Sequence, residues 1–171
     1  MESGAGLVGG SIAVIRSAVL IDRLFLLALT IGLIISAVMG DQFTAALIGP
    51  RAELSAATTG TRLLMLIGVV MAVVILALLH ALRDVVASVR SGDPFVAVNA
   101  GRLQRIGWSL LVLQLLDIPG ALIARFYPSL GDAAPQVGVS PGGWMAVLMA
   151  FVLARVFSAG TAMRDELEGT I

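Results

Sequence analysis

The sequence contains no cysteine and no lysine, and it has a single histidine among 171 residues. The lack of cysteine excludes disulfides, thiolate nucleophiles and cysteine-based metal or iron–sulfur sites. The histidine, His80, has no further histidine or carboxylate ligand at helical spacing, so we expect it to lie at a membrane interface rather than to bind a metal. The sequence therefore predicts a chain without metal or cofactor.

Charge is also scarce. Charged residues make up 13% of the chain and hydrophobic residues 58%, and the mean hydropathy is +1.01. Ordinary soluble domains hold about 25% charged residues and roughly 45–50% apolar ones. The 11 basic residues balance 11 acidic ones, so no net charge favours direct contact with nucleic acid. These values predict an integral membrane protein with the lipid bilayer as its surroundings.

Four apolar runs are long enough to cross a hydrocarbon core of about 30 Å, which needs about 20 helical residues. They cover residues 24–40, 63–79, 106–123 and 144–163. The sequence therefore predicts an all-α membrane protein, a bundle of four transmembrane helices formed by a single domain over residues 1–171. A soluble domain of the usual size, about 100 residues, has no room beside it.

The segment SIAVIRSAVLIDR precedes the first run. In it, apolar Ile12, Ile15 and Val19 alternate with Arg16 and Asp22. This pattern predicts an amphipathic helix that lies along the membrane surface. A cleaved signal peptide is the less favoured alternative, because the apolar run starts late and SAVMG matches a cleavage site poorly.

Arginines in the short loops predict the orientation of the chain in the membrane. One side holds Arg16, Arg23, Arg83, Arg90, Arg102, Arg105 and Arg164, and the other holds Arg51, Arg62 and Arg125. By the positive-inside rule, the first side is cytoplasmic. Both termini and the connection over residues 80–105 are then expected in the cytoplasm, with two loops near 41–61 and 125–143 outside.

The cytoplasmic connection reads HALRDVVASVRSGDPFVAVNAGRLQR and predicts more structure than a plain loop. The second helix is expected to continue past the membrane and to stop at Gly92, a residue type that favours helix ends. Asp93 and Pro94 are typical of the start of another helix. Asn99 is expected either to cap again or to break a turn ahead of Arg102 and Arg105.

Two segments, SGDPFVAVNAGRLQRIGW and VFSAGTAMRDELEGTI, resemble the bacterial membrane family called domain of unknown function 2975 (DUF2975, the YoaS-like proteins). The first resembles that family's connection at Gly92, Pro94, Phe95, Asn99, Leu103 and Ile106. The second resembles the family's ending at Phe157, Gly160, Asp165, Glu166, Leu167, Thr170 and Ile171. The resemblance implies a four-helix membrane protein of unestablished activity. It also implies a cytoplasmic helix-turn-helix regulator as partner, because family genes often lie beside one for such a regulator.

Small residues recur at every fourth position in the first and last apolar runs. They are Ala28, Gly32, Ser36 and Gly40 in the first, and Ala146, Ala150, Ala154, Ser158 and Ala162 in the last. Such stripes let helices approach closely in lipid. They predict packing between the first and fourth helices, or between copies of one of them in a homo-oligomer; chance in an alanine-rich chain is the alternative.

Arg155 is the one charge inside the last apolar run. Counted from the expected helix ends at 1.5 Å per residue, it lies roughly 12 Å deep, with Gln114 at a similar depth and Asp117 at about 16 Å. An unpaired arginine there is costly, so we expect Asp117 to be its anion and Gln114 a further partner. A static ion pair, a proton- or ion-coupled site and a switchable latch all fit this pattern.

These features favour a non-enzymatic inner-membrane protein that acts as the regulatory or signalling partner of a cytoplasmic regulator. The alternative is a small oligomeric transporter or channel that uses Asp117 and Arg155. No residues are predicted to be catalytic, because no serine has a histidine partner and the SPGGW stretch lacks the lysine of a phosphate-binding loop. An enzyme of lipid chemistry therefore has no motif in its support.

Overall fold

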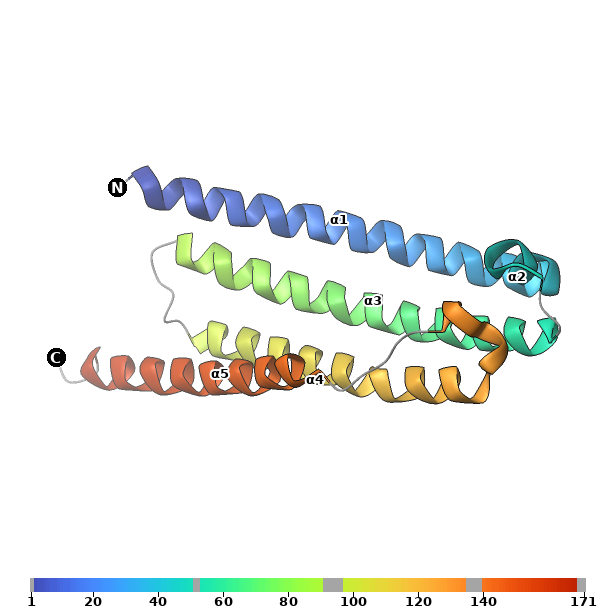
Figure 1. Ribbon diagram of the computed structural model, residues 1–171. Helices are drawn as coiled ribbons and strands as arrows, with labels where there is room; N and C mark the ends of the chain where they lie inside the picture. Colours follow the sequence, from blue (N-terminus) through green and yellow to red (C-terminus); the bar gives the residue numbers. More distant parts are fainter. Residues whose placement is uncertain (1, 51–52, 91–96, 135–139, 169–171) are drawn as a thin grey trace. The chain divides into compact units, whose positions relative to one another are not determined.

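The computed structural model describes residues 2–50, 53–90, 97–134 and 140–168, and every element in them is helical (Figure 1). The elements are α1 (Glu2–Met39), α2 (Asp41–Ile48), α3 (Leu54–Arg90), α4 (Ala97–Phe126), the 3-10 helix η1 (Pro128–Ala133) and α5 (Pro141–Glu168). Four of these helices are long and apolar enough to cross a membrane, over Gly10–Met39, Leu54–Val89, Ala97–Phe126 and Pro141–Arg164. The predicted all-α class with four such helices is confirmed.

The helices are longer than the apolar runs. The loop expected near residues 41–61 is wrong, because α2 and the first turns of α3 occupy most of it. Here threonine hydroxyls lie against the helix's own carbonyls: Thr59 Oγ1 donates to Ser55 O at 3.1 Å, and Thr58 Oγ1 lies 2.9 Å from Leu54 O, one of two acceptors that share its proton. These bonds satisfy the hydroxyls within the helix, so the polar stretch continues α3 instead of ending it.

The N-terminal segment over residues 11–23 is part of α1 and not a separate helix. No proline interrupts it, and Asp22 and Arg23 continue the same helix. Ile15 and Asp22 are buried, whereas Arg16 and Arg23 are exposed. The predicted amphipathic segment is therefore continuous with the first apolar run, because a change in polarity alone does not end a helix.

The chain forms two compact units. The first, here called the α5 unit, comprises Met1–Ile21, Ile75–Val112 and Pro141–Ile171. The second, the α2 unit, comprises Asp22–Val74 and Leu113–Ser140. Three helices, α1, α3 and α4, each contribute one part to each unit.

In the α2 unit, two glycines shape the packing. Gly40 has φ +56°, a left-handed conformation that lets the chain turn between α1 and α2. Gly60 allows η1 to lie against α3, since a Cβ at Gly60 would stand 3.0 Å from both Tyr127 Cβ and Leu130 Cδ1. Leu130 is only 1% exposed and forms part of this unit's core.

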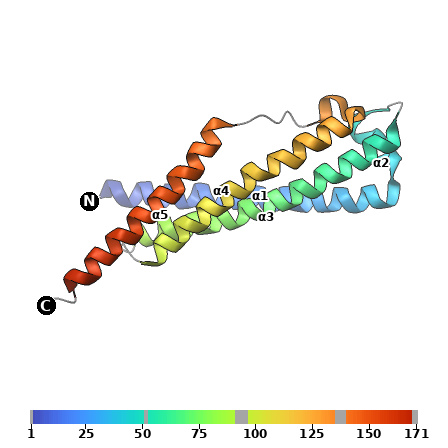
Figure 2. The same ribbon diagram turned by 90° about the horizontal axis from the view of Figure 1, so that it is seen from below.

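In the α5 unit, α5 lies beside the first part of α4 (Figure 2). A Cβ at Gly107 would stand 3.1 Å from the Phe151 ring, so the absence of a side chain there admits the ring. The Trp108 and Phe151 rings meet edge to face at 5.4 Å. On α5, Val147, Ala150 and Ala154 are buried. The buried face of α5 is thus built of small residues and one aromatic ring.

Candidate functional site

A polar cluster around one buried residue joins the end of α3 to the start of α4. Asn99, with no exposed surface, donates from Nδ2 to Ser88 Oγ at 2.6 Å and accepts from Arg102 Nη1 at 2.9 Å. Ser88 Oγ in turn donates to Val85 O at 2.6 Å, and Arg102 Nη1 also donates to Asp84 O at 3.2 Å. We call Asp84, Ser88, Asn99 and Arg102 the junction cluster. It joins the two helix ends through hydrogen bonds that are part-buried, apart from the exposed bond to Asp84 O.

The junction cluster corrects the expectation for Asn99. Asn99 neither caps a new helix nor breaks a turn, because it lies inside the first turn of α4, which begins at Ala97. Its amide reaches across to Ser88 on α3. Arg105 of the same predicted set is exposed. The remaining predicted residues, Gly92, Asp93, Pro94 and Phe95, lie outside the described residues.

A second polar cluster lies in the α2 unit, where α1 turns into α2. Arg62 of α3 donates from Nε to Ser36 Oγ at 3.0 Å and from Nη2 to the Ser36 carbonyl oxygen. One helical turn earlier, Thr58 Oγ1 donates to Asp41 Oδ1 at 2.6 Å. We call Ser36, Asp41, Thr58 and Arg62 the corner cluster. Sequence reasoning missed it, because the i, i+4 spacing of Thr58 and Arg62 has meaning only once this stretch is known to be helical.

The predicted small-residue stripes are partly buried. In α1, Gly32 faces Met65 Cε, which would lie 3.4 Å from an added Cβ, and Ser36 is fully buried. Ala28 is exposed in α1, as are Ala146, Ser158 and Ala162 in α5, whereas Ala150 and Ala154 are buried. The α1 stripe belongs to the α2 unit and α5 to the other unit. Packing between the two stripes stays a prediction.

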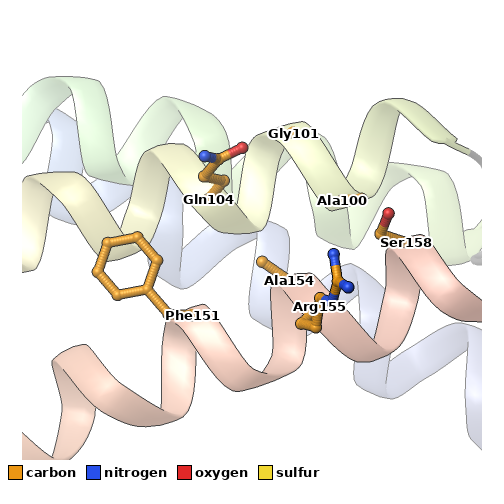
Figure 3. Close-up of a pocket in the computed structure, with 7 residues that line it drawn as sticks. All are labelled: Ala100, Gly101, Gln104, Phe151, Ala154, Arg155 and Ser158. Atoms are coloured by element: carbon orange, nitrogen blue, oxygen red, sulfur yellow. The ribbon is translucent and has the colours of Figure 1, made fainter.

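Arg155 is exposed on α5 and lines a groove of about 240 Å³ between α4 and α5 (Figure 3). Asp117 and Gln114 belong to the α2 unit, where Asp117 is half-buried and Gln114 Nε2 lies 3.5 Å from Ser140 O. The pairing of Arg155 with Asp117 stays a prediction. The depths predicted for Arg155, Gln114 and Asp117 were counted from helix ends that the structure places elsewhere. The helix α4 begins at Ala97 rather than near residue 106, and α5 ends at Glu168 rather than near residue 163.

A family model described as protein of unknown function (DUF2975) matches residues 44–171, which is more than half of the chain. The chain belongs to the DUF2975 family. The predicted resemblance is thereby confirmed, and the match includes the junction cluster and the groove, whereas all of α1 precedes it. No curated protein and no solved structure matches this DUF2975 chain significantly.

Two further polar residues of this DUF2975 protein lie on its long helices. His80 is half-buried, and its Nδ1 lies 2.6 Å from the Leu76 carbonyl oxygen one turn earlier. Asp22 is 8% exposed, and its buried Oδ2 has no hydrogen-bond partner among the described residues. Within that part of the chain, no group of three or more histidine, aspartate or glutamate side chains could hold a metal ion.

Proposed function

We propose that this DUF2975 protein is a non-enzymatic regulatory protein of the bacterial inner membrane that binds a cytoplasmic helix-turn-helix regulator at its α3–α4 junction. The observation that carries the proposal is the junction cluster. Hydrogen bonds among four polar residues join the end of α3 to the start of α4, and Asn99 among them is fully buried. A binding surface requires such fixed geometry, since ordering a mobile surface on binding costs affinity.

The surface around the junction cluster has the chemistry of a polar docking site. Arg83 and Asp84 on α3 are exposed, as are Gln104 and Arg105 on α4. Exposed arginines at an interface supply charge complementarity, which raises association rates and selects partners. The class of partner comes from the family resemblance alone.

This proposal is tested by purifying the tagged chain from its native membranes after mild crosslinking. We expect a soluble helix-turn-helix protein to co-purify with the parent chain, and the double variant Arg83→Glu/Arg105→Glu to lose it. Arg125→Glu changes one exposed arginine in the other unit and is the matched control, which should retain the partner. Recovery of no such protein with the parent, or equal recovery with the double variant, would refute the proposal.

The orientation in the membrane is also proposed, on the strength of the arginine distribution. Since the chain has no cysteine, Ser91→Cys and Ser55→Cys each provide a single thiol. In intact cells, an impermeant maleimide should label Ser55→Cys, at the exposed start of α3, and leave Ser91→Cys unlabelled until the membrane is opened. The reverse pattern would invert the topology, and equal labelling of both before opening would contradict it.

A further inference from the structure

The groove between α4 and α5 lies within the α5 unit and combines one cation with small neighbours. Ala100, Gly101 and Gln104 line it from α4, and Phe151, Ala154, Arg155 and Ser158 from α5. The Arg155 guanidinium and the Ser158 hydroxyl point toward α4 (Figure 3). The alanines and the glycine leave a space of about 240 Å³ in front of the cation.

The groove lies where α4 changes from polar to apolar. On α4, Arg102, Gln104 and Arg105 precede the apolar run that starts at Ile106. Trp108, one turn after Gln104, is 54% exposed and contacts Phe151 edge to face. Exposed tryptophan beside basic residues is typical of the headgroup level of a bilayer. Arg155 thus lies next to a segment with interfacial chemistry, although the sequence around it on α5 is apolar.

Arg155 requires an anion beside its guanidinium where α4 and α5 become apolar. Desolvating a guanidinium without a counter-charge is costly. No carboxylate is among the described residues that line the groove. On α5 the neighbours Val152 and Val156 are large apolar side chains, 61% and 55% exposed, so the surface around the groove is suited to lipid. The described lining of the groove therefore supplies no anion for Arg155, and the apolar surface around it favours one from the lipid.

We propose that this groove binds the phosphate of an anionic phospholipid. Arg155 pairs with the phosphate, and the Ser158 hydroxyl and Gln104 amide donate further hydrogen bonds. Phe151 and Trp108 then contact the first methylenes of an acyl chain. The proposal is independent of the regulatory function above.

The test uses the full chain in a mild detergent and counts bound lipid by native mass spectrometry. Phosphatidylglycerol is titrated against phosphatidylcholine, and inorganic phosphate is added as a separate arm. We expect phosphatidylglycerol to bind at least about fivefold more tightly than phosphatidylcholine, and Arg155→Gln to weaken it at least about tenfold, as the loss of a charge-assisted bond does. Arg125→Gln removes an exposed arginine from the other unit and should change the affinity less than about twofold.

A second variant tests the shape of the groove without changing its charge. Gly101 lines the groove and a Cβ there would meet nothing within 4 Å, so Gly101→Leu adds bulk at the groove and raises helix propensity. This variant should weaken the binding of phosphatidylglycerol about as much as Arg155→Gln does. Unchanged binding by either variant overturns the proposal, and saturation by inorganic phosphate at equal affinity would replace the lipid with a soluble anion.

A pairing of Arg155 with Asp117 predicts different results for variants of the same protein. If Asp117 were the counter-ion, Asp117→Leu alone would destabilise the chain and Arg155→Leu/Asp117→Leu would recover most of that loss. We expect no recovery in the double variant and no loss of phosphatidylglycerol binding by Asp117→Leu. Recovery would assign Arg155 to Asp117 and overturn the lipid site.

Discussion

Replacing Asn99 with alanine should lower the free energy of unfolding by about 2–4 kcal/mol, because two part-buried hydrogen bonds lose their partner at once. Arg102 Nη1 would lose the Asn99 Oδ1 acceptor, and Ser88 Oγ would lose the Asn99 Nδ2 donor. Asn99 has no exposed surface, and Ser88 and Arg102 are half-buried, so both lost bonds lie where water replaces them poorly. Chemical denaturation of the purified chain in one detergent, with the Trp fluorescence as readout, measures the change.

The matched control for Asn99 is its neighbour Val98, which is 61% exposed. Val98→Ala should change the free energy of unfolding by no more than about 0.5 kcal/mol. Asn99→Asp keeps an acceptor for Arg102 and should lose less than Asn99→Ala. In a double-mutant cycle, Asn99→Ala and Ser88→Ala should couple by about 1 kcal/mol. A parent-like Asn99→Ala, or a cycle with no coupling, would mean that the junction cluster does not hold α3 to α4.

Much of this architecture is predictable from hydropathy alone. Four runs of apolar residues require four helices, because lipid offers no partner for backbone groups and a helix satisfies them within one segment. The ends of those helices are not predictable in the same way. Polar Thr58 and Thr59 suggest a loop, yet their hydroxyls bond to their own helix. Hydropathy measures what a residue prefers to contact and gives little information on where a helix ends.

The polar clusters show a second limit of sequence reasoning. The family resemblance marked Asn99 as notable, but its partner Ser88 lies on another helix and no periodic pattern relates the two. For Arg155, the sequence indicated that an arginine in an apolar run must be neutralised. The residues around Arg155 depend on which part of α4 packs against α5. That register follows from the packing of the Phe151 ring against Gly107.

Arg62 should be as important to the α2 unit as Asn99 is to the junction. The Ser36 carbonyl oxygen lies in the last turn of α1 and already accepts from the Gly40 N–H at 3.0 Å. Arg62 supplies its second donor and also binds the Ser36 hydroxyl. A cation at a helix C-terminus neutralises exposed carbonyl dipoles. Arg62→Leu removes both bonds and leaves a fully buried serine without its donor, so we expect a loss of about 2–4 kcal/mol in the free energy of unfolding.

Three variants separate this role from a general effect of charge. Arg125→Leu removes an exposed arginine from the same unit and should cost no more than about 0.5 kcal/mol. Arg62→Lys keeps the charge but cannot present two donors in a fixed fork, so it should recover only part of the loss. Ser36→Ala removes only the hydroxyl bond and should cost less than Arg62→Leu. Hydrogen exchange in the last turn of α1 should accelerate in Arg62→Leu and not in Arg125→Leu. If both arginine variants exchange and unfold alike, Arg62 does not anchor the end of α1 to α3.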